Sequence, residues 1–592
     1  MRKRLLTMTF CALLGGAVQA EDLSDFLPFL QAPEQSSTED TAGLERRLMD
    51  YELEASDLQR RLQGVEEQQS RLEDQLEGFR IYGYGLGQLR RFHVTGQGAE
   101  SARDFLGRPL WYDAVENEAQ TQGSKANERI LMTISGRPNS QLEVVSDLNA
   151  RSIWGGAPQL TTDNIAIRVN SSLISAIAGT YWAEFTPLTL YYAADHPWFE
   201  SSLFQRPRED WLGEQGIQGS KRKLEGVYSE LTLENLYLKG LMSRVRSKDG
   251  ASPFHRYLTG FSLTLFPQRQ SFLGANWVSL ADDPSTGSGE AARGELLGID
   301  WQVKLRQNLF CSGEYVRSSY DDDVATGLAA IPDQASVTEL LWRGEKLLLQ
   351  TRLLKVGPYY YAPTSQSRQY DLSVLSVFGP DEAQSAMGTA IARTLEALPY
   401  GLSTPNRRGY QFRALYQPQG RLLAAFERTD LNELRPADAG GTIVTALNSK
   451  RHYTVEKLGA EADLTGFLKV GGLELPSREL KLLGQLERRT VSRRDDPQTP
   501  GDEQLAFTSS ITDLGLAYQL YPGWRLVWGQ KQTKNQGELE GSQLTNAFGV
   551  EIAISSQTVL EVTSKKSAFR DSADAAGDYE AKVLELSLKA NF

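Results

Sequence analysis

The sequence contains few residues of the kinds that hold metals or covalent cross-links. Only two of its 592 residues are cysteines, Cys11 and Cys311. Cys11 lies in an amino-terminal segment that we expect to be cleaved, so the mature chain would hold a single thiol and no internal disulfide. The four histidines are scattered without the spacing of metal ligands: His93, His196, His255 and His452. We therefore expect no metal centre and no cofactor.

Catalytic motifs are also missing. A hydrolase would need a nucleophile or paired carboxylates with a positioned base, and the sequence contains neither a Gly-x-Ser-x-Gly elbow nor a phosphate-binding Gly-Lys loop. The run Asp321-Asp322-Asp323 offers oxygen ligands for a divalent cation but lacks the spacing of a calcium loop, and we interpret it as a solvated turn. The sequence thus predicts a protein that is not an enzyme.

Long apolar runs are absent beyond residue 20. No later stretch offers the roughly 20 consecutive apolar residues of a membrane-spanning helix, so we expect any membrane insertion to use a closed β-barrel, whose backbone groups pair within the protein. A mean hydropathy of −0.39 fits a barrel, because only every second residue of a strand faces lipid. The net charge of −12 argues against a nucleic-acid partner.

The amino terminus has the features of a secretory signal peptide. Residues 2–4 are basic, residues 5–18 are apolar, and Val18-Gln19-Ala20 presents the small residues of a cleavage site. The sequence therefore predicts export, with the first 20 residues removed. Residues 21–43 are acidic and include serine, threonine and proline, and we expect them to form a flexible leader.

Residues 44–79 carry a heptad repeat, in which apolar residues and one glutamine recur in steps of four and three. These positions are Leu44, Leu48, Tyr51, Ala55, Leu58, Leu62, Val65, Gln69, Leu72, Leu76 and Phe79. Such a narrow stripe is typical of a coiled coil and predicts a self-associating helix roughly 50 Å long at ~1.5 Å per residue. The residues expected to hold the oligomer are Leu44, Leu48, Leu58, Leu62, Val65, Leu72 and Leu76. The alternative is a single amphipathic helix packed on a domain.

From residue 80 to residue 592 the sequence alternates with a period of two. The clearest segments are 260–266, 299–306, 410–416 and the last residues, where Leu584, Leu586 and Leu588 alternate with polar residues. This pattern predicts an all-β fold, a transmembrane antiparallel β-barrel of about 16–24 strands with about 20 favoured, preceded by the α-helical coiled coil. A secreted or periplasmic all-β protein is the alternative.

The first predicted strand is unusual because glycines alternate with large residues. Tyr82, Tyr84 and Leu86 are separated by Gly83 and Gly85, and Gly87 follows. We expect the glycines on the inner face, where the wall approaches other segments closely. We expect the tyrosines on the outer face, at the membrane interface.

The predicted links between strands alternate between short and long. Short links fall at 138–140, 268–270, 306–308, 343–345, 417–420, 522–523 and 555–557. Long polar links fall at 95–127, 193–225, 281–293, 321–335, 358–408, 430–441, 494–503, 533–542 and 568–578. Short turns at one end and long loops at the other are typical of outer-membrane barrels, with the short turns in the periplasm.

The two ends of this barrel region resemble known families. The last strand, ending on Phe592, resembles the terminal strand of Gram-negative outer-membrane β-barrels, and this resemblance makes Phe592 an assembly signal for the barrel-assembly machinery. A Gly-Tyr-rich first strand after a short coil resembles trimeric porins with an N-terminal periplasmic coil, including some sugar and dicarboxylate-type porins. The resemblance implies a homotrimer in outer-membrane lipid, with the coil in the periplasm.

Strand parity assigns a set of polar residues to the lumen of the predicted barrel. The pore-lining candidates are Arg90, Asp300, Gln302, Lys304, Arg413, Arg525, Glu561, Glu585 and Lys589. Their charges are mixed, so the ion preference stays open. Two long links, 193–225 and 358–408, hold aromatic and basic residues and are expected either to fold inward and narrow the lumen or to lie exposed with solvated charges.

These features predict an outer-membrane porin for passive diffusion of small hydrophilic solutes. One alternative is a gated barrel that exports a polymer or ligand, with the coil bound to a periplasmic partner. A second is a structural barrel whose coil tethers the outer membrane to the cell wall. The coil discriminates between them, because only the porin interpretation requires it to form a trimer.

Overall fold

The computed structural model divides the chain into two compact units, Met1–Glu77 and Gly78–Phe592. The residues that the structure describes are 80–96, 112–113, 118–119, 123–139, 141–153, 159–181, 183–190, 224–246, 254–268, 270–287, 291–321, 330–362, 402–419, 421–437, 449–465, 469–470, 473–474, 479–493, 505–537, 540–571 and 578–591. The predicted signal peptide, leader and coiled coil, and the terminal Phe592, lie outside these ranges.

The described part of the second unit consists of β-strands and one short 3-10 helix, η4 (Pro284–Thr286). The strands are β1 (Arg80–Thr95), β2 (Tyr112–Asp113), β3 (Glu118–Ala119), β4 (Gly123–Asn139), β5 (Leu142–Ile153), β6 (Gln159–Asn170), β7 (Ile174–Tyr181), β8 (Leu224–Leu233), β9 (Leu236–Arg246), β10 (Arg256–Gln268), β11 (Ser271–Asp282), β12 (Arg293–Arg306), β13 (Leu309–Asp321), β14 (Ile331–Arg343), β15 (Leu347–Val356), β16 (Arg407–Gln419), β17 (Leu422–Glu433), β18 (His452–Asp463), β19 (Lys469–Val470), β20 (Leu473–Glu474), β21 (Leu480–Arg493), β22 (Leu505–Tyr521), β23 (Trp524–Gly537), β24 (Gly541–Ala553), β25 (Thr558–Asp571) and β26 (Tyr579–Asn591). No helix among the described residues is long and apolar enough to cross a membrane.

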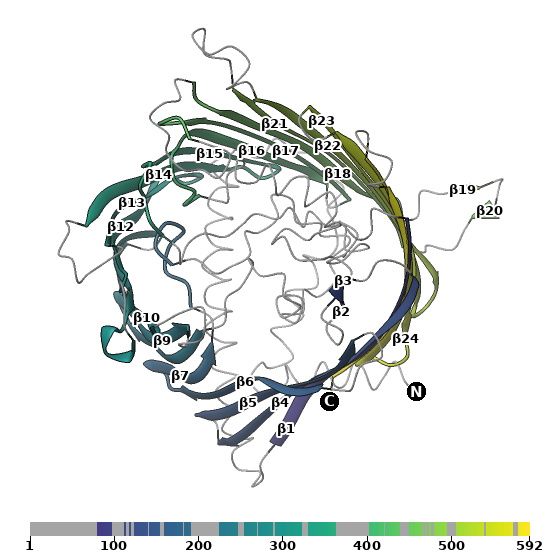
Figure 1. Cartoon of the computed structure of the whole chain (residues 1–592), viewed down its shortest axis with the longest axis horizontal. Helices are drawn as coiled ribbons and strands as arrows, with labels where there is room; N and C mark the ends of the chain where they lie inside the picture. The colour runs from purple at the N-terminus through teal and green to yellow at the C-terminus, as the bar shows by residue number, and fades with distance from the viewer. Residues whose placement is uncertain are drawn as a thin grey trace, which may run out of the picture. The chain divides into compact units, whose positions relative to one another are not determined.

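Twenty-two of these strands form a single sheet that closes on itself. Strands adjacent in the sequence pair antiparallel around the ring, and β1 completes it by pairing with β4 on one side and with β26 on the other. Figure 1 looks down through this ring. The all-β antiparallel fold is therefore confirmed, and 22 strands fall within the predicted range of about 16–24, two above the favoured count.

The two faces of the sheet differ in polarity, as the alternation predicts. In β12, Leu297, Ile299 and Val303 are exposed, whereas the neighbouring Leu296 is buried. In β26 the three alternating leucines are exposed and Ser587 between them is buried. The exposed apolar face is the outside of the ring, because the opposite face packs against segments that bridge several strands, as described below.

The prediction that the glycines of the first strand face inward is wrong at Gly85 and Gly87. Leu86 is 1% exposed and Leu89 is 42% exposed, so Gly85 and Gly87, which share the parity of Leu89, lie on the outer face. A Cβ atom on Gly87 would meet nothing within 4 Å. Gly87 pairs with Leu588 and Ile130, which are large and exposed, so the neighbouring strands supply the outer apolar surface that the glycines lack.

The links alternate in length around the ring, as the sequence indicates. All seven predicted short links join strands at one end, here called the turn end, and the predicted long links lie at the opposite loop end. One long link is corrected: β23 continues to Gly537 and β24 begins at Gly541, so only residues 538–540 connect them. The structure also adds a link that the sequence did not reveal, because residues 464–479 carry the hairpin β19–β20 at the turn end.

Replacing Ile299 with arginine tests the assignment of the outer face. Ile299 is exposed on the outer side of β12, and a charge facing the middle of a bilayer costs about 2–4 kcal/mol. We expect the Ile299→Arg variant to lose this free energy of unfolding in a denaturant titration of lipid-reconstituted protein. Gln302→Arg on the inner face of the same strand is the control, and an equal loss in both variants would contradict the assignment.

Candidate functional site: the inner wall of the barrel

The inner face of β14 to β17 carries a continuous network of polar side chains. Arg352 donates from Nη2 to Glu339 Oε2 (2.8 Å) and from Nη1 to Gln411 Oε1 (2.8 Å). Gln411 donates to Glu427 Oε1 (3.0 Å), and Arg413 donates from Nη2 to Glu427 Oε2 (2.9 Å). Each charge on this stretch of wall therefore has an oppositely charged or amide partner on a neighbouring strand, which offsets the cost of removing it from bulk water.

Four of the predicted pore-lining charges belong to such pairs. Arg413 is part of the network above, Arg525 Nη1 lies 3.2 Å from Glu551 Oε2, and Lys589 Nζ lies 3.2 Å from Glu561 Oε1. The structure places all of them on the face opposite the exposed apolar residues. At these positions each charge is paired with one of opposite sign, and the assignment of these residues to a pore stays a prediction.

The remaining candidates lie on β12, β1 and β26. Gln302 of β12 donates to the Gln270 carbonyl (3.2 Å), and Glu585 belongs to β26. Asp300 accepts a hydrogen bond from Asn276 Nδ2 (2.6 Å) and lies opposite Glu314 in the register of β12 and β13. The Lys304 ammonium lies 6.0 Å from the centre of the Phe310 ring. The backbone of Arg90 is paired with that of Glu585, but the Arg90 side chain lies outside the described part of the structure.

The segment that follows β7 turns into the ring. Residues 183–190, called the inward segment, include Leu188, Thr189 and Leu190, which have no exposed surface. Lys239 of β9 donates to the Glu184 carbonyl (3.0 Å). These contacts fix the inward segment against the inner face of the wall rather than outside the loop end.

A single carboxylate holds the turn of the inward segment. Glu314 of β13 is buried and accepts hydrogen bonds from the Leu188 amide at Oε1 (3.3 Å) and Oε2 (3.1 Å), and from the Thr186 hydroxyl. Tyr360 donates from its hydroxyl to the Leu188 carbonyl (2.5 Å). Burial, with the nearby Glu314 carboxylate second, raises the pKa of the Tyr360 phenol well above its ordinary value, so Tyr360 stays a hydrogen-bond donor at physiological pH.

Glycines in the wall make room for the inward segment. A Cβ atom on Gly260 of β10 would lie 2.8 Å from the Phe185 ring, and one on Gly298 of β12 would lie 3.3 Å from Thr189 Cγ2. Any larger residue at Gly260 would therefore push the segment off the wall. The sequence shows these glycines, but only the fold reveals that they meet a segment more than 70 residues earlier.

An apolar cluster packs the inward segment against one side of the ring. Its members come from the inner face of β7 to β15, the inward segment and the start of the link after β15: Tyr181, Ala183, Leu188, Leu190, Leu224, Tyr228, Leu241, Leu258, Val278, Leu296, Val316, Ala335, Val337, Val356, Tyr360 and Ala362. The inward segment thus covers an apolar part of the wall, whereas β14 to β17 carry the polar network, and a smaller apolar cluster that includes Ala425, Val527 and Ala547 lies on the later strands.

The two long links that the sequence analysis selected are described only in part. Residues 193–223 of the first lie outside the described ranges, and the inward segment precedes them. Of the second, Tyr360 and Ala362 are buried in the apolar cluster, and the Asn406 amide donates to the Gly357 carbonyl (2.9 Å), which closes the base of the link. The start of the link at 358 therefore folds inward, as one of the two interpretations predicted.

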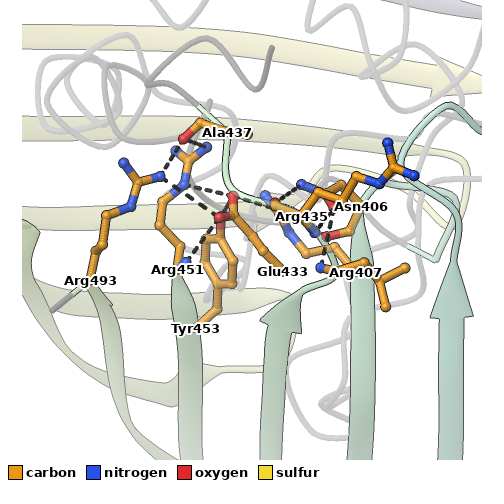
Figure 2. A network of polar contacts seen from close by, with 9 residues as sticks. Asn406, Arg407, Glu433, Arg435, Ala437, Arg451, Tyr453 and Arg493 are labelled. Carbon is orange, nitrogen blue, oxygen red and sulfur yellow. Dashed lines mark hydrogen bonds and ion pairs between the residues drawn. The ribbon is translucent and has the colours of Figure 1, made fainter. Parts of the chain in front are cut away.

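A buried cluster of charges joins the loop end of four strands (Figure 2). Glu433 Oε1 accepts from Arg451 Nε (2.7 Å) and from the Tyr453 hydroxyl (3.1 Å), and lies 3.4 Å from Arg407 Nη1. Arg493 Nη2 lies 3.7 Å from Glu433 Oε2. The Arg407 guanidinium also lies 4.1 Å from the centre of the Tyr453 ring. The Glu433 carboxylate at the end of β17 therefore contacts three guanidinium groups, from β16, from the residue before β18 and from β21.

Within the described ranges, no group of three or more histidine, cysteine, aspartate or glutamate residues is placed to hold a metal ion. Of the acidic run at 321–323, only Asp321 is described, as the last residue of β13.

Comparisons with known proteins give similarities of fold only. No family model matches the chain, and no curated protein sequence is similar to it. Solved structures with a similar fold include Pseudomonas aeruginosa OpdL (10% identity, 87% of this chain and 99% of that chain, TM-score 0.35). They also include the Pseudomonas aeruginosa outer membrane protein OprD (9%, 86% and 94%, 0.36) and the P pilus usher PapC translocation pore (8%, 87% and 99%, 0.37). At these scores the likeness carries no functional inference for this chain.

Replacing Glu433 with glutamine tests how far the loop-end cluster depends on the Glu433 carboxylate. The change removes the one carboxylate that the described residues show in contact with these three guanidinium groups, and removing one partner of a buried charge pair costs about 3–5 kcal/mol. We expect this loss in the free energy of unfolding of the reconstituted barrel.

The control is Glu456→Gln, because the Glu456–Arg428 pair is largely exposed and such pairs contribute about 0–1 kcal/mol. Equal stabilities of the Glu433→Gln variant and the parent protein would show that other groups neutralise the cluster.

Proposed function

We propose that the chain is an outer-membrane porin through which small hydrophilic solutes diffuse passively. The observation that carries this proposal is the closed ring of 22 strands with apolar side chains outside and paired charges inside. A hydrocarbon layer requires an apolar surface with every backbone group paired, and a water-filled lumen requires polar side chains. The proposed location is the outer membrane of a Gram-negative cell, in contact with its lipid.

The width of the ring requires a constriction if only small solutes are to pass. Strands spaced ~4.8 Å apart and tilted by about 40° give a ring roughly 40 Å across for 22 strands. Barrels of roughly 16–18 strands already enclose an aqueous channel. The inward segment and the Tyr360 region narrow this lumen from one side, and in the proposal the solute passes between them and the polar wall.

The charges of the proposed path favour weak ion selectivity. Arg413, Arg525 and Glu561 have oppositely charged partners within 3.2 Å. Selectivity then depends on the radius of the constriction and on the local potential rather than on one ring of like charges.

The oligomeric state and the partners in this proposal rest on the sequence alone. The heptad positions of residues 44–79 support self-association through a periplasmic coil, and the resemblance to trimeric porins supports a homotrimer, with Phe592 read by the barrel-assembly machinery. A periplasmic or cell-wall partner of the coil is the alternative use of the same heptads.

Single-channel recording of the mature protein in planar bilayers tests the proposal. We expect stable openings in groups of three, because three barrels would be held by one coil. Replacing Leu58, Leu62, Leu72 and Leu76 with aspartate is expected to give monomers that open singly with unchanged unit conductance. Folded protein that never conducts would favour the exporter or the tether instead.

Removing the Glu314 carboxylate tests the inward segment as the constriction. Without it the Leu188 amide and the Thr186 hydroxyl lose a buried acceptor, so the segment loosens and the path widens. We expect Glu314→Ala to raise the single-channel conductance by about half, since conductance follows the narrowest radius. Glu295→Ala, on the outer face of β12, is the matched control, and unchanged conductance in Glu314→Ala would place the constriction elsewhere.

A further inference from the structure

The outer face of the barrel contains a hollow of about 390 Å³ on β18, β21, β22 and β23, which are neighbours in the wall (Figure 1). Leu482, Leu514 and Trp528 are exposed, which places their parity on the outside of the ring. The lining side chains of outward parity, together called the outer hollow, are Ala460, Ala462, Leu482, Gly484, Leu514, Leu516 and Trp528. All of them are apolar, so the hollow suits an apolar occupant.

The smallest residues of two strands make the floor of the outer hollow. Ala460 of β18 lies directly opposite Gly484 of β21. A Cβ atom on Gly484 would come no closer than 3.8 Å to Leu514 Cδ2, so the space over this glycine is open. Leu458 and Leu486 are large and exposed, and they border the floor on the side of the loop end. An unbranched aliphatic chain fits such a trough between larger side chains.

Two cations lie on the same outer face, nearer the loop end. Arg488 of β21 and Lys534 of β23 are exposed, and both lie directly opposite Ser510 of the intervening β22. Strands spaced ~4.8 Å apart put their Cα atoms roughly 10 Å apart, so both side chains and the Ser510 hydroxyl can reach one anion. Among the residues that the structure describes, neither cation has an ion-pair or hydrogen-bond partner.

The hollow and the cations lie at different depths of a membrane. Strand β21 begins at Leu480, at the turn end. At ~3.3 Å per residue and a tilt of about 45°, Arg488 lies roughly 19 Å above Leu480, with Gly484 halfway along this rise. The apolar band of a barrel is about 25 Å tall. The outer hollow therefore lies within the band, whereas Arg488 lies near the loop-end border, where lipid headgroups begin.

A lipid that carries a phosphate matches both features at once. Its phosphate supplies the counter-charge of Arg488 and Lys534, and its acyl chain reaches down into the outer hollow. A soluble anion would leave the hollow empty. A second copy of the chain is less suited, because acidic residues of this outer face already pair with cations of their own copy: Glu225, Glu295, Asp430, Glu456 and Glu580.

We propose that the outer hollow, together with Arg488, Ser510 and Lys534, binds one membrane lipid, with an acyl chain in the hollow and the lipid phosphate on the two cations. The site rests on the proposed function in one respect, because it requires the barrel to span a membrane. It adds a fixed lipid partner, separate from the passage of solutes through the lumen.

Native mass spectrometry of the mature protein in a non-ionic detergent tests the site, with didodecanoyl phosphatidic acid as the probe. We expect Arg488→Gln with Lys534→Gln to weaken binding of the first probe molecule about ten-fold, because two charge-assisted contacts with the phosphate are lost. The matched control is Lys355→Gln with Arg408→Gln, which removes two exposed cations that are register partners on β15 and β16. Equal weakening in the two double variants would overturn the site.

Filling the outer hollow tests the acyl chain separately from the charges. Gly484→Leu places a side chain in the trough, and its Cβ atom meets only an ordinary contact at Leu514, so the strand is not disturbed. We expect binding of the probe to weaken about ten-fold, because the chain loses its apolar contacts. Gly87→Leu, at an outward glycine of β1 with open space around it, is the control and is expected to bind normally. Normal binding in Gly484→Leu would contradict the proposal.

Two further outcomes assign this face to another occupant. Displacement of the probe by excess inorganic phosphate would assign the cations to a soluble anion. A fall in oligomeric mass of the Arg488→Gln, Lys534→Gln variant, with lipid binding unchanged, would assign the face to a second copy, and either result overturns the lipid site. Single-channel conductance is expected to be unchanged in all these variants. A parent protein that binds the lipid but never conducts would instead reject the porin proposal and leave the site intact.

Discussion

The pairing of backbone hydrogen bonds around a closed ring is the constraint on which the rest of this structure depends. Strand β1 makes antiparallel pairs with both β4 and β26, so the sheet has no terminal strand. In hydrocarbon, each unpaired amide or carbonyl costs several kcal/mol. Closure satisfies the backbone groups around the circumference, and it lets large apolar side chains occupy the outer face while the inner face accommodates paired charges. The alternating polarity of β12 and β26 follows directly, because successive side chains of a strand point to opposite faces.

A ring of this size has a wide interior whose side chains must be solvated or packed. The later strands and the earlier strands differ in how this is achieved. On the later strands, Arg352, Glu427 and their neighbours neutralise one another on the wall, so polar groups face the lumen without an excess of charge. On the earlier strands, the inward segment covers an apolar wall, and the buried Glu314 carboxylate is stabilised because three donor contacts reach it. The lumen is consequently asymmetric, and its polar path lies against one side.

The sequence predicts structural features that follow from the local repeat of two residues, and it does not predict features that depend on contacts between residues far apart in the chain. The outward leucines of β26, the inner positions of Arg413 and Glu561 and the two classes of link were predictable, because each follows from a repeat of two residues or from a turn. The inward segment was not predictable, because it depends on a hydrogen bond between Glu314 and Thr186, which are 128 residues apart in the sequence. Gly298, which makes room for the segment, cannot be distinguished in the sequence from other glycines in strands. The face of Gly87 was wrongly predicted because a glycine in isolation favours neither face, and parity was set by Leu86 and Leu89.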